Sequence, residues 1–278
     1  MVSRAERGQD RWRILFWQLA ILVAIVAAWE YLTGIKAISK TPGLYWIDPF
    51  FISRPSAIAA RFAFLASDQV RLSIWQMALS TVQSTLWGFL AGVGSGFVVG
   101  LVLGRNDRLA RIFEPYIIAF NSLPRIALVP LITMVFGFGI LAKVVLAWTI
   151  VFFIVFFNTF QGARSVDAEL IHSARFLGAG ERQIVRSVII PSALGWTFAA
   201  LTPSISFALI GVVVGEFLGG ESGGGLGYLI IQSLGTLNAA DMMVALLSLG
   251  AIGIVMALGI KQLERRLLRW RPEYRERA

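Results

Sequence analysis

The residue types that most often carry out catalysis or bind metals are scarce in this sequence. It contains no Cys and a single His, His172, so thiolate metal sites, imidazole clusters and a Ser-His-Asp site are not expected. The glycine-rich run at 223–227 follows no predicted strand and precedes no Lys-Ser/Thr pair, which makes it a weak candidate for a phosphate-binding loop. We therefore expect neither catalytic residues nor a metal site.

Arg125 is a different kind of candidate, because it lies within the apolar segment 115–136 together with Pro124 and Pro130. Two prolines and a charge are costly inside a membrane helix unless they face protein or water. Arg125 is therefore a candidate for the path of an anionic solute. The alternative, an arginine that snorkels to the interface or pairs with another helix, stays open.

The composition identifies the medium in which these residues must work. Hydrophobic residues make up 57% of the chain and charged residues 15%, whereas about 25% charge is usual in soluble domains. The long apolar segments predict an all-α integral membrane protein rather than a barrel of alternating strands. The net charge of +9 does not indicate nucleic acid, because Lys and Arg collect in cytoplasmic loops and no basic stretch is interleaved with aromatic residues.

Six apolar segments predict six transmembrane helices, at 14–32, 72–103, 115–136, 140–160, 191–218 and 242–260. The first has the basic flank of a signal peptide but ends at Trp29-Glu30-Tyr31, so we expect an uncleaved helix. Glycines recur at every fourth position of the second segment, which places them on one face where a neighbouring helix can approach closely. These packing glycines are Gly88, Gly92, Gly96, Gly100 and Gly104.

The distribution of Arg predicts that both termini are cytoplasmic, although Lys36, Lys40, Arg54 and Arg61 run against the trend. The predicted organisation, beyond the helix at 14–32, is a cytoplasmic arm (1–13), an external connector (33–71), a membrane core (72–262) and a cytoplasmic basic tail (263–278). The connector is expected to contain a short helix at 56–65, and residues 219–240 are expected to form an external loop or re-entrant segment.

The core contains a polar cytoplasmic region at 164–191, most of which does not look like membrane. Residues 165–167 can cap a helix in which Leu170, Ala174 and Leu177 share an apolar face. Gly178 and Gly180 break that helix, and a second one, 181–190, leads to Pro191. Two short helices at an angle make a rigid knob that can dock in a groove of a partner protein.

A family resemblance rests on this region. The residues His172-Ser173-Ala174, Gly178, Val188 and Ile190-Pro191 keep every spacing of the signature Glu-Ala-Ala, three residues, Gly, nine residues, Ile, one residue, Leu-Pro. The chain therefore resembles the membrane (permease) subunits of bacterial ATP-binding-cassette (ABC) importers. Short motifs are similar to the branch that imports nitrate, taurine and aliphatic sulfonates: 53–56, 121–124, 136–139, 158–159 and 225–228. His172 departs from the usual Glu; it could replace the polar contact of that Glu, or apolar packing and Gly178 could suffice.

The resemblance implies a type I ABC importer permease fold with a cytoplasmic coupling helix in the bacterial inner membrane. It implies two copies of the chain, most simply a homodimer in membrane lipid, two cytoplasmic ABC ATPase subunits and an external solute-binding protein. ATP and Mg would bind to the ATPase subunits, and this chain, which lacks Gly-x-x-x-x-Gly-Lys-Ser/Thr, would bind no cofactor. The residues expected to couple to the ATPase are Leu170, His172, Ser173, Ala174, Leu177, Gly178 and Ala179. Those expected on the translocation path are Asn121, Arg125, Thr202, Ser206 and Glu216.

The expected solute is a small organic or inorganic anion such as nitrate, a sulfonate or taurine, and Arg125 favours an anion. A pyrimidine-like or other small metabolite is the alternative. A secondary transporter or a membrane enzyme is the alternative of another class. No internal repeat supports the first of these, and no cluster of Asp, Glu or His supports the second.

Overall fold

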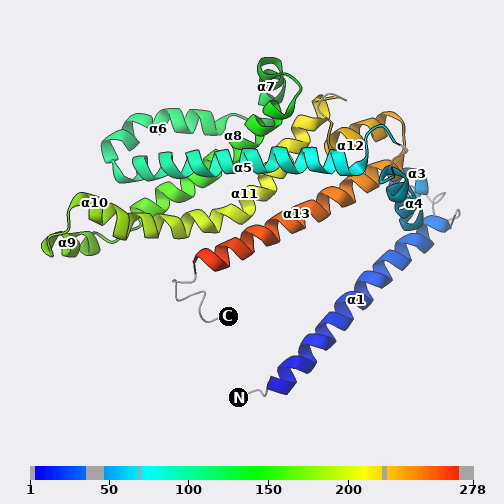
Figure 1. Ribbon diagram of the computed structural model, residues 1–278, viewed down its shortest axis with the longest axis horizontal. Helices are drawn as coiled ribbons and strands as arrows, with labels where there is room; N and C mark the ends of the chain where they lie inside the picture. Colours follow the sequence, from blue (N-terminus) through cyan, green and yellow to red (C-terminus); the bar gives the residue numbers. More distant parts are fainter. Residues whose placement is uncertain (1–3, 36–46, 68–69, 221–223, 269–278) are drawn as a thin grey trace. The chain divides into compact units, whose positions relative to one another are not determined.

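The computed structural model describes residues 4–35, 47–67, 70–220 and 224–268, and every regular element in these ranges is a helix (Figure 1). Five helices are long and apolar enough to cross a membrane, and a bent pair is a sixth candidate. The five are α1 (Arg4–Gly34), α5 (Ile74–Arg105), α8 (Ile140–Arg164), the continuous helix 181–218 and α13 (Ala239–Leu267). The expected all-helical membrane fold is confirmed. Lys36, Lys40 and the residues beyond 268 lie outside the described ranges.

The chain divides into two compact units, of which the first comprises the residues up to Ser73 together with 230–246. In it, α3 (Pro49–Ile52) is followed by α4 (Pro55–Leu65), and α4 is tied to α1, because the Glu30 carboxylate accepts from the Ser56 amide at 2.9 Å and from the Ser56 hydroxyl at 2.7 Å. Arg61 of α4 pairs with Asp241 of α13, and these hydrogen bonds raise the pKa of the Arg61 guanidinium. Arg61 is one of the basic residues that run against the orientation trend, and the Asp241 carboxylate compensates its charge.

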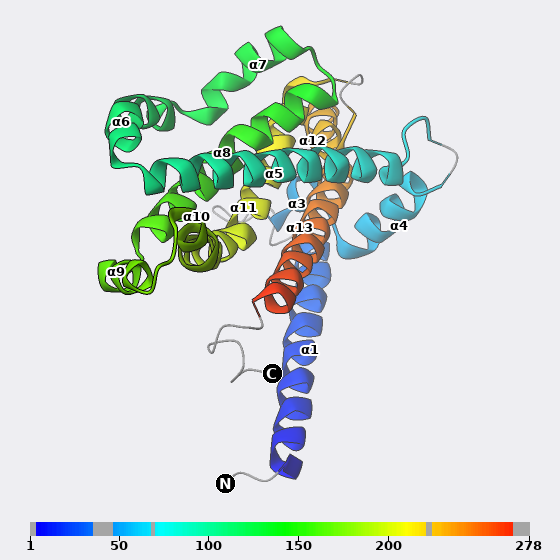
Figure 2. The ribbon, with the colours of Figure 1, turned by 60° about the vertical axis from the view of Figure 1, so that its left-hand side comes forward.

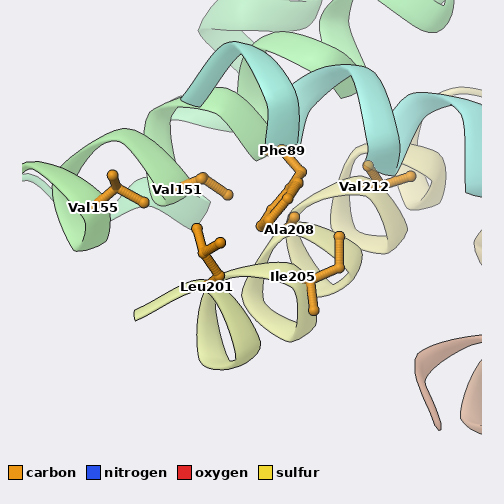
Figure 3. Close-up of a cluster of buried hydrophobic side chains, with 8 residues drawn as sticks. Phe89, Val151, Val155, Leu201, Ile205, Ala208 and Val212 are labelled. Carbon is orange, nitrogen blue, oxygen red and sulfur yellow. The ribbon is translucent and has the colours of Figure 1, made fainter. Parts of the chain in front are cut away.

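The second unit, 74–229 and 247 onward, is built on α5, α8 and α11 (Ile190–Leu218). Its core contains Phe89 of α5, Val151 and Val155 of α8, and Leu201, Ile205, Ala208 and Val212 of α11, whose side chains converge in Figure 3. The glycine face of α5 lies directly on α8: a Cβ at Gly92 would lie 2.5 Å from the Cβ of Val151, and one at Gly100 would lie 2.8 Å from the Phe156 carbonyl oxygen. The absence of side chains there lets the two backbones approach closely.

The third predicted span is broken. It begins as α6 (Asp107–Ser122) and continues as a short 3-10 turn, η2 (Arg125–Leu128), and α7 (Val129–Phe136), with a bend of 83° between the two parts. Leu123 is extended (ψ 127°), as expected for a residue that precedes a proline. The span predicted over 115–136 therefore starts earlier, at Asp107, and is not one continuous helix, and the break places Arg125 at the start of η2.

At Pro191 the sequence predicts a boundary between two helices, but the structure has no break there. α10 (Glu181–Ile184), the π-helical turn η3 (Val185–Ile189) and α11 form one continuous helix of 38 residues. In the π turn the Ile190 amide donates to the Val185 carbonyl. This wider turn immediately precedes Pro191, whose ring lacks the N–H that a regular α turn would use.

Candidate functional site

The polar region between α8 and α11 folds as a helix followed by a tight turn (Figure 2). The helix, α9, spans Ala168–Phe176, and Asp167 is its N-cap residue. The Asp167 carbonyl accepts from the amides of Leu170 (3.1 Å) and Ile171 (3.3 Å), but its side chain makes no capping hydrogen bond. The helix therefore begins where the sequence predicts.

The turn that ends α9 explains the spacing between Ala174 and Gly178. The Ala179 amide donates to the Ala174 carbonyl at 3.0 Å, and the Gly178 amide donates to the Arg175 carbonyl at 2.9 Å. This pair of hydrogen bonds defines a Schellman motif, which requires a left-handed residue at the position of Gly178. The φ of Gly178 is +84°, in the region that favours glycine.

Apolar side chains seat this helix and turn on the long helices. Ile171, Ala174 and Ala179 pack against a buried cluster formed by Ala163, Ile184, Ile189 and Ala193. The predicted apolar face of Leu170, Ala174 and Leu177 is therefore divided: Ala174 faces inward, whereas Leu170 and Leu177 are exposed. The inward side chains of α9 are thus Ile171 and Ala174, and Ala179 beyond the turn contributes to the same contact.

Charged side chains fix the turn from the outside. The Glu181 carboxylate accepts from Arg175 of α9 at 2.7 Å and from Arg105, the last residue of α5, at 2.9 Å. Each of these pairs is half-exposed and contributes little stability alone. Together they link α9, α10 and α5 at one carboxylate, so the turn is held at the end of the helical core.

The outer surface of α9 carries apolar side chains with no intramolecular use. Phe176 is 94% exposed and Leu177 85% exposed, and Leu170, His172 and Ser173 also face outward. Exposed apolar groups of this size next to polar residues are typical of a surface that binds a partner. Phe176 was missed by the sequence reasoning, because its position beside Gly178 does not reveal which way the last helical turn faces.

A second candidate site is the groove in front of the break in the third span, about 540 Å³ in volume. Arg125 donates from Nη2 to the Asn121 side-chain oxygen at 2.9 Å and from Nη1 to the Asn121 carbonyl at 3.3 Å. Its guanidinium carbon lies 4.8 Å from the centre of the Phe153 ring. In the described part of the chain no carboxylate pairs with Arg125. The remaining lining is apolar: Pro124, Ile126, Ile150, Ile154, Phe157, Phe207 and Ile210.

The structure brings only some of the path candidates together. Thr202 is partly exposed and Ser206 exposed, and both lie on the same face of α11 as Ile210, because the three are spaced by four residues. Glu216 is fully buried and does not line the groove; it is enclosed by Thr81, Lys143 and Gly227. Lys143, which the sequence reasoning missed, was signalled only by its position as the one charged residue within the segment 140–160.

No group of three or more His, Asp or Glu side chains that could hold a metal ion occurs within the described residues.

Comparison with known proteins identifies a family that this chain matches. Residues 92–269 match the family described as "Binding-protein-dependent transport system inner membrane component". The chain is 29% identical to a protein of Bacillus subtilis (strain 168) named as an aliphatic sulfonates transport permease, over 98% of this chain and 93% of that one. It is 33% identical to the riboflavin transport system permease of Chloroflexus aurantiacus, over 80% and 81% of the two chains. It is 28% identical to the taurine transport system permease of Escherichia coli (strain K12), over 83% and 84%.

Solved structures show the same fold. An inward-facing structure of the MetNI methionine ABC transporter contains a chain that superposes with a TM-score of 0.58 at 23% identity, covering 70% of this chain and 94% of that one.

Proposed function

This chain belongs to the family of binding-protein-dependent transport system inner membrane components, so it is a multi-pass permease subunit of an ABC importer, and we propose how its two candidate sites serve that function. The exposed surface of α9 and its turn is the contact for an ATPase subunit. The groove at Arg125 is part of the path for a small anion. The observation that carries the proposal is the exposed tip, Phe176 and Leu177, held rigidly at Gly178.

The coupling role follows from how the tip is mounted. Ile171, Ala174 and Ala179 anchor it on α8 and α11, and Glu181 links it to α5. A force on Phe176 and Leu177 would therefore be transmitted to the three helices that form the core, rather than absorbed by a loose loop. The His172 side chain lies on the exposed side and makes no hydrogen bond to the described residues, so it is available to contact the ATPase. Ser173 is exposed beside it and belongs to the same contact.

Two copies of the chain, two ATPase subunits and an external solute-binding protein would complete the transporter. ATP and Mg would bind to the ATPase subunits, because this sequence has no P-loop. Each copy would offer one tip to one ATPase subunit, and the closure of the ATPase pair on ATP would push the two tips together.

The arginines support an orientation in which the tip is cytoplasmic. Arg105 ends α5 and pairs with Glu181 of the polar region, and Arg164 ends α8 and pairs with Asp107 at the start of α6. By the positive-inside rule, the concentration of arginine at one end of the bundle supports a cytoplasmic location for that end. With an even number of spans, the arm at 1–13 and the tail at 263–278 would be cytoplasmic, and the connector at 33–71 external.

The solute proposed for the path is a small organic anion of the sulfonate class. Arg125 offers a positive charge with no described carboxylate to neutralise it, and guanidinium groups suit planar or tetrahedral oxyanions. The apolar lining would accept a short aliphatic group beside the anionic head. Two relatives with this kind of solute in their names, for sulfonates and taurine, support the proposal.

A planar metabolite is the second candidate solute. Phe153, Phe157 and Phe207 line the groove, and aromatic walls favour stacking of a flat ring. A riboflavin permease is among the relatives, with 33% identity.

Reconstitution tests the function directly. Proteoliposomes containing this chain and its ATPase, supplied with the binding protein outside and ATP inside, should accumulate the ligand of the binding protein. Vesicles with the chain alone serve as the control and should accumulate none. Equal ATP-independent accumulation in both preparations would contradict the proposal and would indicate a secondary transporter. Competition by taurine, by an alkyl sulfonate and by a flavin distinguishes the two classes of solute.

A further inference from the structure

A buried charge pair lies where α5, α8, α11 and the start of α12 (Leu226–Gly235) meet. Lys143 is 2% exposed and Glu216 is 0% exposed, and the Lys143 Nζ lies 3.3 Å from the Glu216 Oε1. Lys143 also donates to the Ser80 hydroxyl at 2.9 Å. The function proposed above uses neither charge, so their burial requires its own explanation.

The polar groups around the pair hold the first turn of α12. The Gly227 amide donates to the Glu216 Oε2 at 2.9 Å, and the Leu226 amide donates to the Thr81 hydroxyl oxygen at 3.1 Å. Thr81 in turn lies 2.9 Å from Glu216 Oε1. The first amides of a helix have no partner within the helix, and a carboxylate near them also interacts favourably with the helix dipole. Here α5 and α11 supply what would otherwise be a local cap.

Glycines at the start of α12 make room for this arrangement. A Cβ at Gly225 would overlap the Glu216 carboxylate, and a Cβ at Gly227 would lie 2.7 Å from the Val213 carbonyl oxygen. Two glycines of the run that resembles a phosphate-binding loop in sequence, Gly225 and Gly227, therefore lie against a carboxylate of the same chain.

The energetics of buried charges indicate that the Lys143–Glu216 pair fixes the position of the first turn of α12 and adds little to stability. Desolvation of two charges largely cancels their attraction, so apolar residues of similar volume would stabilise such a site equally well. Removal of one partner alone leaves an uncompensated buried charge. What the pair provides is a fixed geometry between the core helices and the first turn of α12.

We propose that Lys143 and Glu216 are positioning residues that latch the start of α12 to α5, α8 and α11, so that movement of the core helices during transport carries this turn with it. The latch rests on the proposed function, because only in a transporter do the core helices move in a cycle. It predicts that uptake per ATP hydrolysed depends on the latch even when the fold is intact.

Amide exchange tests the latch without reference to transport. In the purified chain in nanodiscs, Thr81→Val should speed exchange of the Leu226–Leu229 amides by roughly 10- to 100-fold, because it removes the acceptor of the Leu226 amide. Thr81→Ser keeps the hydroxyl and should exchange like the wild type. The double variant Lys143→Met/Glu216→Gln should also speed exchange there and leave the amides of α8 protected. Unchanged exchange of 226–229 in both Thr81→Val and the double variant would overturn the latch.

If the amides of the double variant lose protection throughout the chain, Glu216→Asp is the deciding variant. It keeps the negative charge but shortens the side chain that accepts from the Gly227 amide. Faster exchange confined to 226–229 in that variant supports the latch, and wild-type exchange overturns it.

In the complete transporter, Thr81→Val should lower uptake per ATP several-fold relative to Thr81→Ser. An unchanged ratio despite faster exchange would remove the latch from the transport cycle. Absence of ATP-driven uptake in the wild type would instead refute the proposed function and leave the exchange result standing.

Discussion

The amide of Ala179 donates to the carbonyl of Ala174 at 3.0 Å, and the residue enclosed by this bond, Gly178, has a φ of +84°. The bond brings Ala174 and Ala179 together on the same buried cluster, next to Ile184 and Ile189. The family spacing of Ala, three residues and Gly is thus the spacing of one helix-ending turn. The direction of the exposed tip depends on that turn.

Gly178→Ala should impair coupling through backbone strain alone. A Cβ at Gly178 would have open space around it, so the penalty is the left-handed conformation, about 1–2 kcal/mol. Gly180→Ala is the matched control, because Gly180 also has open space but a φ of −72°. We expect the transporter assembled with Gly178→Ala to hydrolyse ATP with reduced uptake, and the transporter with Gly180→Ala to behave as the wild type. Equal ratios of uptake to ATP hydrolysis in the two variants would contradict this role.

Phe176→Ser should weaken binding of the ATPase subunits. Burial of a Phe side chain at an interface contributes about 1.5–3 kcal/mol, which corresponds to a change in Kd of roughly 10- to 150-fold. Phe176 has no buried contacts to lose, at 94% exposed, so the thermal stability of the permease alone should not change. Phe176→Leu, which keeps an apolar side chain, is the control. Titration of the ATPase onto nanodisc-embedded permease measures the effect, and equal affinity of the Ser and Leu variants would exclude Phe176 from the contact.

The membrane helices could be predicted from sequence because about 20 consecutive apolar residues are a strong signal. The effect of each proline could not. Pro115 and Pro203 lie inside helices and Pro191 near the start of α11, whereas Pro124 coincides with the 83° bend. Whether a proline breaks a membrane helix depends on whether neighbouring groups satisfy the freed backbone atoms, and that is a tertiary property.

The candidate site at α9 and the buried pair could likewise be predicted from the sequence only in part. The position of Gly178 follows from local backbone geometry and could be read from spacing, whereas the inward rotation of α9 depends on Ala163 and Ile189, which belong to other helices. Lys143 and Glu216 are 73 residues apart, and neither position indicates the other. Glu216 was recognised as unusual from sequence, but its enclosure by Thr81 and Gly227 requires the fold.

Gly92→Ala should destabilise the packing of α5 on α8. The added Cβ would lie 2.5 Å from the Val151 Cβ and 3.1 Å from the Phe152 amide nitrogen, and such overpacking costs about 1–3 kcal/mol. Gly94 lies on the same helix with open space around it, so Gly94→Ala should be neutral or stabilising by up to about 1 kcal/mol. Thermal unfolding of the purified variants in detergent distinguishes them. A melting temperature for Gly92→Ala equal to that of Gly94→Ala would show that α5 and α8 do not pack closely at this glycine.

Arg125→Gln should lower the uptake of an anionic solute while ATPase binding and assembly stay intact. The guanidinium is positioned by Asn121 and lies over Phe153, and its charge has no described carboxylate partner, so the groove loses its only described cation on substitution. Arg125→Lys keeps the charge but not the planar fork that binds an oxyanion in two places, and an intermediate rate is expected. Arg108→Gln, a change of the same charge at an exposed position outside the groove, is the control.

The measurement is the initial rate of uptake at saturating binding protein, with ATP hydrolysis recorded in the same vesicles. A rate for Arg125→Gln equal to that of Arg108→Gln would remove Arg125 from the path. A selective loss for a sulfonate but not for a flavin would assign the arginine to recognition of the anionic head.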